Sequence, residues 1–593
     1  MKKNYIFLLS IFLLSSCNFD LIISNGENDT IESKEQNTFS EESITSIEDN
    51  SSIEETISNV EELSSSEEII SSEEEISSIE EDSSYEENSL EEQSSSIIED
   101  SSSIEEDFSS EEASSENTSS TLGSNQYRDN VDRNSIHYSS KLQNDPNHTV
   151  RQLEVFELND THGAYYEEND GDISVARAFT CIKEYTNDPY ATLKIANGDM
   201  MQGSAFSNML LGEPAVAALN EMAFDCYVIG NHEFDWGLDV LSIYKDNDPS
   251  NGELDCPFLC ANLANKSKDV PDWIEPYTVV NKGDLKVGII GIIGDGLENQ
   301  ISKVYIGDYY FTDTVAAVNK YCDILLNQEH VDSIIVSSHD HVIETNQRYV
   351  DNNKIDAIIN GHDHTSVEEY VTRYDSKRIP VIESNTKNTR NGLGKLTLNY
   401  DDNKQFNSYS IRHFNYLQDY ELDENLADIL DIYHDVIKDY QSEIIGYNPS
   451  YLDKEGVARK TANYLATYYD CDLVILNRGG IRSTLPKGDV TIGKIYEIYP
   501  FDNELVIAEL KGYELKNILD DEHIEMNYFN NNTELSTSSS YFYASNVSNY
   551  TTYKVCSIDY VTIKDYMANY FNEAHNQIHT GVYIRDLAFE AFK

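Results

Sequence analysis

The chain has 593 residues and a formal net charge of −66 at neutral pH. Its length exceeds the usual size of one domain, so we expect more than one folded region. The strongly acidic composition argues against a nucleic-acid polymer as partner, because such polymers require basic patches on the protein. Beyond the N-terminal apolar run, the sequence predicts no stretch of about 20 apolar residues that would span a membrane.

The N-terminus has the pattern of an export signal. Lys2 and Lys3 precede an apolar run from Tyr5 to Leu14, which is followed by Ser15, Ser16 and Cys17. The run is too short for a stable membrane-spanning helix. The ending LSSC resembles the lipobox of bacterial lipoproteins, in which the cysteine is lipidated. We therefore expect residues 1–17 to be a lipoprotein signal peptide and Cys17 to anchor the protein to the outer face of a bacterial cell membrane. The alternative is an ordinary signal with a chance cysteine.

Residues 18–122 consist mainly of Ser and Glu, and the sequence SSIEE recurs at Ser51, Ser77 and Ser102. The 33 acidic residues of this segment face a single lysine, Lys34, which gives a net charge of −32. Such a segment cannot bury enough apolar surface to offset its chain entropy, so we expect a long disordered stalk, which with its linker occupies residues 18–150. Residues 123–593 carry a further −36. An anionic substrate would therefore need a cationic centre.

Seven cysteines follow Cys17, and most of them lie in or beside apolar segments. This placement favours free buried thiols over disulfides. The pair Cys256 and Cys260 has no second pair to complete a zinc site, so a structural metal site there is not expected.

Between about residues 150 and 415, short β-branched runs alternate with helical patterns, which is typical of an α/β layer structure. Five apolar runs end on potential ligands, namely Asp160 and His162, Asp199, Asn231 and His232, His339, and His362 and His364. Ligands of α/β sheets bind where the carboxyl ends of strands converge, so these side chains are expected to meet. Mixed oxygen and imidazole ligands suit Zn, Mn, Fe, Co or Ni.

The blocks NDTHG, NGDMMQG, GNHEFD, SSH and NGHDH occur in this order. They resemble the calcineurin-like metallophosphatase domain of the secreted 5'-nucleotidase family, which includes bacterial UDP-sugar hydrolases and 2',3'-cyclic nucleotide phosphodiesterases. The resemblance implies a four-layer αββα domain over residues 151–415 that binds two divalent metal ions. One ion would be bound by Asp160, His162, Asp199 and His364. The second would be bound by Asp199, Asn231, His339 and His362, with Asp199 bridging and His341 competing for the place of His339.

The resemblance also assigns roles to the rest of GNHEFD. His232 would lie over the phosphoryl group, where it would stabilise developing charge or protonate the leaving oxygen, and Asp235 would orient its imidazole. A general acid in such a position contributes roughly 10²–10⁴-fold to the rate. For Glu233 we expect only a hydrogen bond that holds the loop in shape.

Residues 421–440 have helical periodicity, with Leu426, Ile429, Ile432 and Ile437 on one side. This segment resembles the helix that links the two domains of the family, and we place the linker at residues 416–445. Residues 472–515 resemble the core of the family's smaller α/β C-terminal domain, expected at residues 446–593. The resemblance implies a nucleotide pocket lined by Asn477, Arg482, Phe501, Asn503 and Tyr560.

Two departures affect this pocket. Relatives follow the aromatic residue with a GGDG turn, whereas Tyr560 is followed by no glycine pair, and Asp565 lies one position short. The arginine that relatives carry after a block corresponding to VARKTANY is missing, with Arg459, Lys460 or Arg478 as substitutes.

The sequence thus predicts an exported metallophosphoesterase that hydrolyses nucleotides to nucleoside and phosphate, with no obligate protein partner evident. A cyclic-nucleotide or UDP-sugar hydrolase and a non-catalytic surface binding protein are the alternatives.

Overall fold

The computed structural model describes residues 125, 127–167, 173–267, 270–301, 303–384, 392–520, 526–529, 547–562, 571 and 575–593. The predicted signal peptide, Cys17 and the predicted stalk up to Leu122 lie outside these residues. None of the described helices is both long and apolar enough to cross a lipid bilayer. The seven cysteines after Cys17 are free and buried, which confirms that prediction.

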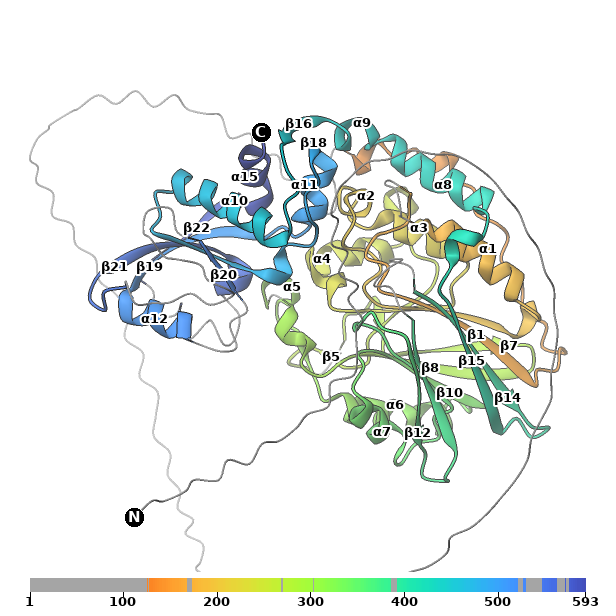
Figure 1. The fold of residues 1–593 in the computed structure, drawn as a ribbon. Coiled ribbons are helices and arrows are strands. Elements are labelled where there is room, and N and C mark those ends of the chain that lie inside the picture. Colours follow the sequence, from red (N-terminus) through yellow and green to blue (C-terminus); the bar gives the residue numbers. More distant parts are fainter. Residues whose placement is uncertain are drawn as a thin grey trace, which may run out of the picture. The chain divides into compact units, whose positions relative to one another are not determined.

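Two mixed sheets form the larger part of the described chain (Figure 1). One sheet has the order β15 (Phe406–Phe414), β14 (Gly392–Tyr400), β1 (Gln152–Asn159), β2 (Thr192–Asn197), β3 (Cys226–Val228), β4 (Phe258–Leu259) and β6 (Ile274–Glu275). The other has the order β12 (Val367–Thr372), β13 (Arg378–Glu383), β11 (Ala357–Ile359), β10 (Ser333–His339), β8 (Leu285–Ile293) and β7 (Tyr277–Lys282). A separate pair joins β5 (Leu263–Ala264) and β9 (Tyr310–Phe311).

The alternation of side chains between the two faces of each strand explains how the two sheets pack. Leu153 and Val155 of β1 belong to the core shared with the second sheet, whereas Phe156 and Leu158 belong to the core formed with helices. Because successive side chains of a strand point to opposite faces, β1 can contribute to both cores. The helices on the first sheet include α1 (Val175–Tyr185), α3 (Glu213–Glu221) and α8 (Glu424–Asp435), and those on the second include α6 (Thr314–Asn327) and α7 (Ile343–Val350) (Figure 1). This is the expected four-layer αββα arrangement.

The remaining short helices of this region are α2 (Ala205–Asn208), α4 (Gly237–Ser242), α5 (Lys303–Ile306) and α9 (Lys438–Gln441). The single helix predicted over residues 421–440 is two helices in the structure, because α8 ends at Asp435 and α9 begins at Lys438. Ile437 is nevertheless fully buried, so the apolar pattern correctly marked the packed side of this segment.

The C-terminal part contains a sheet with the order β20 (Met526–Phe529), β17 (Leu473–Asn477), β21 (Thr552–Ile558), β19 (Glu504–Lys511) and β22 (His575–Tyr583). A second pair of strands joins β16 (Ile444–Asn448) and β18 (Gly488–Thr491). The helices are α10 (Lys454–Tyr468), α11 (Ile492–Ile498), α12 (Gly512–Asp520), α13 (Asp559–Thr562) and α15 (Ile584–Ala591). Buried residues of α10, α11 and α15 pack on β17, β19 and β21 in one core, which gives the smaller α/β unit that was expected.

The segment before β1 is fixed to the first sheet's helices by a buried ion cluster. Arg133 Nε donates to Glu213 Oε1 at 2.6 Å, and Arg128 Nε lies 2.7 Å from Glu213 Oε2. Tyr433 of α8 donates to the same carboxylate at 3.2 Å, and the Glu213 side chain is fully buried. One carboxylate at the start of α3 thus joins the N-terminal segment to α8.

We expect Glu213→Ala to lower the free energy of unfolding by about 3–5 kcal/mol, because it leaves two arginines without their buried partner. Denaturant unfolding of the purified protein measures this loss. The control is Asp255→Ala, which removes an exposed pair with Lys141 at 2.7 Å and should cost about 1 kcal/mol or less. Equal losses in the two variants would contradict the role assigned to the buried cluster.

Candidate metal centre and adjoining pocket

The five predicted strands are all present, and each one ends at the candidate ligands that follow it. These strands are β1, β2 and β3 of one sheet and β10 and β11 of the other. Neighbours β1, β2 and β3 run parallel, as do β10 and β11. The carboxyl ends of parallel strands lie at one edge of a sheet, so the two sheets present their candidate ligands at a common edge.

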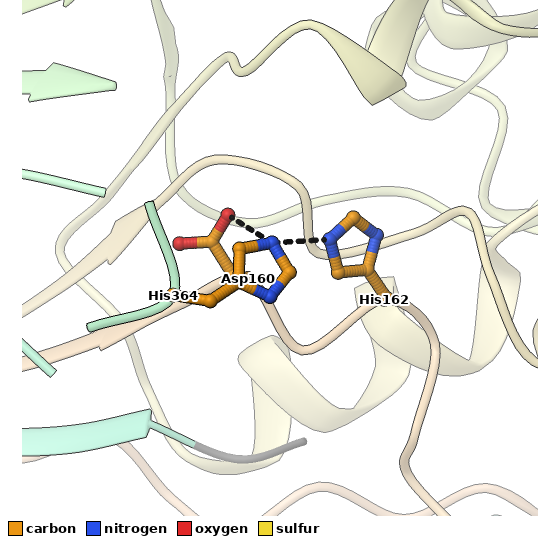
Figure 2. Close-up of side chains that lie close together, drawn as sticks. All are labelled: Asp160, His162 and His364. Carbon is orange, nitrogen blue, oxygen red and sulfur yellow. Dashed lines mark hydrogen bonds and ion pairs between the residues drawn. The ribbon is translucent and has the colours of Figure 1, made fainter. Parts of the chain in front are cut away.

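Asp160, His162 and His364 form the first group of potential metal ligands, shown in Figure 2. One ligand atom of each lies within 4.8 Å of the others. His162 Nε2 and His364 Nε2 are 3.1 Å apart, and His364 Nε2 lies 3.5 Å from Asp160 Oδ1. Two imidazole nitrogens and a carboxylate oxygen that face one point are a suitable donor set for a divalent ion.

Asp199, His339 and His362 form a second group on the same criterion. Asp199 Oδ2 lies 3.1 Å from His339 Nε2 and 4.0 Å from His162 Nε2. Asp199 is therefore within reach of both groups, as a bridging ligand must be. The structure places His339 in this group, whereas His341 lies in a different one.

Several buried polar atoms of the candidate ligands have no hydrogen-bond partner among the described residues. They are Asp160 Oδ1, Asn231 Oδ1, His339 Nε2 and His362 Nδ1. Leaving a buried donor or acceptor without a partner costs about 1–3 kcal/mol. Bound cations would satisfy these oxygen and nitrogen atoms, so the residues present fit divalent metal ions.

Backbone carbonyls fix the orientation of two of the imidazoles. His162 Nδ1 lies 3.1 Å from the carbonyl oxygen of Gln202, and His339 Nδ1 lies 2.8 Å from that of Asn197. A carbonyl only accepts hydrogen bonds, so each Nδ1 carries the hydrogen and each Nε2 is turned toward the candidate ions. Such outer contacts typically hold histidine ligands in position.

Five candidate ligands have an unusual backbone conformation. The φ angles of Asp160, His162, Asp199, His362 and His364 are 48°, 46°, 52°, 81° and 56°. Non-glycine residues rarely adopt positive φ, and such strain persists where the surrounding structure enforces it, often at functional sites. The backbone is also crowded at Gly230, where a Cβ atom would lie 2.4 Å from Asp199 Oδ1.

Burial and charge together set the protonation of these groups. Burial opposes a charge on His339, but Asp199 and Asp160 raise the pKa of His339 to about 10. Burial, together with the charge on His339, lowers the pKa of His362 to about 4. Burial raises the pKa of the Asp199 carboxyl, but His339 and His232 outweigh it and hold that pKa well below its usual range. The environment thus favours a carboxylate at Asp199 with positive charge beside it.

His232 lies next to the centre with its ring fixed by Asp235. His232 Nδ1 is 2.8 Å from Asp235 Oδ2, which leaves Nε2 available, and a ligand-type atom of His232 lies within 4.8 Å of His162 and Asp199. Burial lowers the pKa of His232, but the carboxylates of Asp235 and Asp199 overcome it and raise that pKa. This geometry places a proton donor at the edge of the centre.

Glu233 holds the loops together through hydrogen bonds, which is the role expected for it. Its carboxylate accepts hydrogen bonds from the backbone N–H groups of Asp199 at 2.8 Å and Gly230 at 2.7 Å, and from Tyr227 Oη at 2.6 Å. Glu233 therefore joins the loop after β2 to the loop after β3.

A pocket opens beside His232 and contains all five residues that the resemblance assigned to nucleotide binding. They are Asn477, Arg482, Phe501, Asn503 and Tyr560. The Phe501 ring stacks on the His232 ring with centroids 5.6 Å apart and an interplanar angle of 24°. The Arg482 guanidinium carbon lies 5.9 Å from the Phe501 ring centroid. The aromatic and cationic groups of the C-terminal part thus adjoin the candidate metal centre.

The loop that carries Phe501 is fixed by main-chain contacts. Buried Arg585 donates to the carbonyl oxygens of Tyr499 at 3.2 Å and Pro500 at 3.1 Å, and Asn208 of α2 donates to the same Pro500 oxygen at 3.3 Å. The position of Phe501 is therefore set from both parts of the chain.

The pocket is also lined by residues that the sequence analysis did not identify, namely Gln300, Tyr305, Asp502 and Asp559. Asp502 and Asp559 each adjoin a predicted pocket residue, Phe501 and Tyr560, and this adjacency was the local signal available. Gln300 and Tyr305 come from a segment without a motif. Arg459, Lys460 and Arg478, considered as substitutes for the missing arginine, are not among the described residues that line this pocket. Arg459 instead pairs with Glu455 at 2.7 Å.

We expect Asp199→Asn to lower the metal content of both groups, because it removes the anionic side chain that reaches both. Elemental analysis of the purified variant measures the ions per chain. The matched control is Asp356→Asn, which alters a buried carboxylate paired with Arg373 at 2.6 Å, before the start of β11. The control should lose stability but keep its ions. Unchanged metal content in Asp199→Asn would contradict the bridging role.

Two parts of the chain match known protein families. Residues 154–366 match the sequence profile of the calcineurin-like phosphoesterase family, and residues 431–565 match that of the 5'-nucleotidase C-terminal domain. Endonuclease YhcR of Bacillus subtilis is 27% identical over 413 residues, which cover 62% of this chain and 32% of the relative. The 5'-nucleotidase of Vibrio parahaemolyticus is 24% identical over 426 residues, which cover 63% of this chain and 74% of the relative.

The solved structure of a 5'-nucleotidase precursor from Thermus thermophilus has the same fold. It aligns with a TM-score of 0.62 and 18% identity over 74% of this chain and 96% of that chain. The match with the Bacillus endonuclease spans only about a third of that relative. The chain belongs to the family in which a calcineurin-like phosphoesterase domain is followed by a 5'-nucleotidase C-terminal domain.

Proposed function

We propose that the protein is a metal-dependent phosphoesterase that hydrolyses nucleotides to nucleoside and phosphate. The observation that carries this proposal is that three features adjoin one another. They are the two groups of candidate metal ligands around Asp199, the His232–Asp235 pair, and the pocket lined by Phe501 and Arg482. Relatives of the chain are named 5'-nucleotidase and nucleotide phosphoesterase, which supports the substrate class.

The proposed centre holds two divalent ions, one at Asp160, His162, Asp199 and His364 and one at Asp199, Asn231, His339 and His362. When bound, such a pair supplies Lewis-acid activation of water and neutralises charge on a phosphoryl group. Asn231 contributes an amide oxygen and therefore adds no further negative charge to a centre that already contains Asp160 and Asp199.

The protein's own residues supply the remaining steps. His232, oriented by Asp235, donates a hydrogen bond or a proton to the phosphoryl group from Nε2, because Nδ1 is engaged at 2.8 Å. Arg482 binds an oxygen of phosphate or ribose through its planar donors. The Phe501 ring provides a face for the base, and stacking of this kind tolerates any base. Asn477, Asn503 and Tyr560 complete the pocket wall.

We propose that the protein works outside the cytoplasmic membrane, attached through a lipid on Cys17. The support is the N-terminal sequence, with two lysines, a short apolar run and the LSSC ending. Radiolabelled palmitate incorporation that is abolished by Cys17→Ser would support the anchor, and a soluble, unlabelled wild type would contradict it.

A substrate panel tests the reaction. Phosphate release from nucleoside monophosphates is measured for the metal-loaded protein, with 2',3'-cyclic nucleotides, UDP-sugars and a small aryl phosphate in parallel. We expect turnover of the monophosphates, and loss of all turnover after chelation with recovery on adding a divalent ion. Binding of nucleotides without turnover of any ester would instead identify a surface binding protein.

Two variants separate chemistry from recognition. His232→Ala should lower kcat for every substrate by roughly 10²–10⁴-fold without changing metal content, because it acts on the phosphoryl group. Phe501→Ala should weaken nucleotides by about 1–3 kcal/mol and leave the aryl phosphate nearly unchanged, because that substrate has no base. Steady-state kinetics on both substrates measure the difference.

Each variant has a matched control outside the pocket. His434→Ala removes a histidine of α8 that stacks on Tyr166 with centroids 4.2 Å apart, and Tyr451→Ala removes an exposed aromatic of the C-terminal part. Both should retain wild-type kinetics. If Phe501→Ala harmed the two substrates equally with the fold intact, the pocket would not select the base.

A further inference from the structure

Beside the candidate centre lies another group of ligand-type side chains, made of His341, Asp363 and Glu383. One ligand atom of each lies within 4.8 Å of the others. They come from three segments: His341 from the turn between β10 and α7, Asp363 from the connection between β11 and β12, and Glu383 from the end of β13. No role in the proposed reaction uses any of them.

The His341 imidazole faces carboxylates on two sides without a hydrogen bond to either. Its Nδ1 lies 3.6 Å from Asp363 Oδ2, and its Nε2 lies 3.7 Å from Glu369 Oε2 of β12. These separations are too long for hydrogen bonds. Two ligands about 2.1 Å from one ion lie roughly 3.0–3.5 Å apart, so a small shift would place His341 Nδ1 and Asp363 Oδ2 around one ion. Nε2, on the opposite side of the ring, would stay beside Glu369.

Glu383 is the most informative member of the group. It is fully buried, its Oε1 accepts a bond from the Thr365 N–H at 3.3 Å, and its Oε2 has no partner among the described residues. A buried carboxyl of this kind either stays protonated or binds a cation, because an isolated buried carboxylate is too costly.

The unpartnered oxygen of Glu383 favours a cation. A protonated Glu383 would carry an O–H donor, yet Oε2 has no acceptor among the described residues. An ion bound at His341 Nδ1 would give Glu383 Oε2 a partner and would offset the negative charge of Asp363. One imidazole with carboxylates is a donor set suited to Mn²⁺ or Zn²⁺.

We propose that His341, Asp363 and Glu383 bind a divalent transition-metal ion at a site separate from the Asp199 centre. The ion ties the ends of β10, β11 and β13 together. His341 follows His339 by two residues, and Asp363 lies between His362 and His364, whose φ angles are 81° and 56°. The separate ion therefore holds the strained loops that carry three histidines of the centre. This site stands on its own geometry and does not depend on the proposed reaction.

The test measures Mn²⁺ bound per chain, by elemental analysis after gel filtration, for the full chain and three variants. Asp363→Asn should bind one ion fewer than wild type, and it should fold, because the Asp363 side chain is 49% exposed. The Glu383→Gln variant should also bind one ion fewer, because glutamine mimics a protonated glutamate and lacks the charged carboxylate that would bind the ion. Asp402→Asn, which alters a fully exposed carboxylate, should bind as many ions as wild type. Unchanged ion counts in both Asp363→Asn and Glu383→Gln would overturn the proposal.

A second measurement separates this site from the centre. In the Asp199→Asn background, Mn²⁺ should still raise the unfolding temperature, because binding to the folded state stabilises it. Adding Asp363→Asn to that background should abolish the increase. If the increase is the same with and without Asp363→Asn, the proposed site does not exist. If the increase in unfolding temperature is lost only in the double variant, the separate metal site is supported. If wild type at the same time hydrolyses no ester, the proposed function is wrong although this site exists.

Discussion

The burial of negative charge is the constraint on which the functional end of this protein depends. Asp160 and Asp199 are each 1% exposed and lie against a set of imidazoles at the carboxyl ends of two packed sheets. Two carboxylates in such a place repel each other and lose their hydration, which is costly unless positive charge accompanies them. Divalent ions supply that charge, and without them a proton on His339 can supply part of it. The fold brings these groups together, and cations make that arrangement favourable.

The same edge carries backbone strain, which the rest of the structure must offset. A residue in a sparsely populated conformation costs about 1–3 kcal/mol, and five candidate ligands have positive φ. The two large cores around the sheets supply the rigidity, and Glu233 transmits it to the loops by accepting bonds from the N–H groups of Asp199 and Gly230. A residue outside the groups of candidate metal ligands thereby sets the geometry of Asp199, which belongs to them.

The features that could be predicted from the sequence are those encoded within one short stretch of the chain. An apolar run followed by Asp, Asn or His is a contiguous signal, and it identified the strand ends at Asp160, Asp199 and His339 together with the shared edge. Features made by distant segments carried no such signal. Tyr305 enters the pocket from a short helix without a motif, and Glu383 meets His341 only because β13 and β10 lie in one sheet. The break between α8 and α9 is also invisible in the apolar periodicity, because Ile437 stays on the buried side.

The stacking of Phe501 on His232 restricts how a base can enter the pocket. A ring inserted between two others needs about 3.5 Å on each side, or roughly 7 Å between the outer rings. The centroids of Phe501 and His232 are only 5.6 Å apart, so no base fits between them in this arrangement. Under the proposed function, a base must then use the opposite face of Phe501, while the face toward His232 closes the wall next to the candidate metal ligands. One phenyl ring can thereby take part in recognition on one side and shield the reacting group from water on the other.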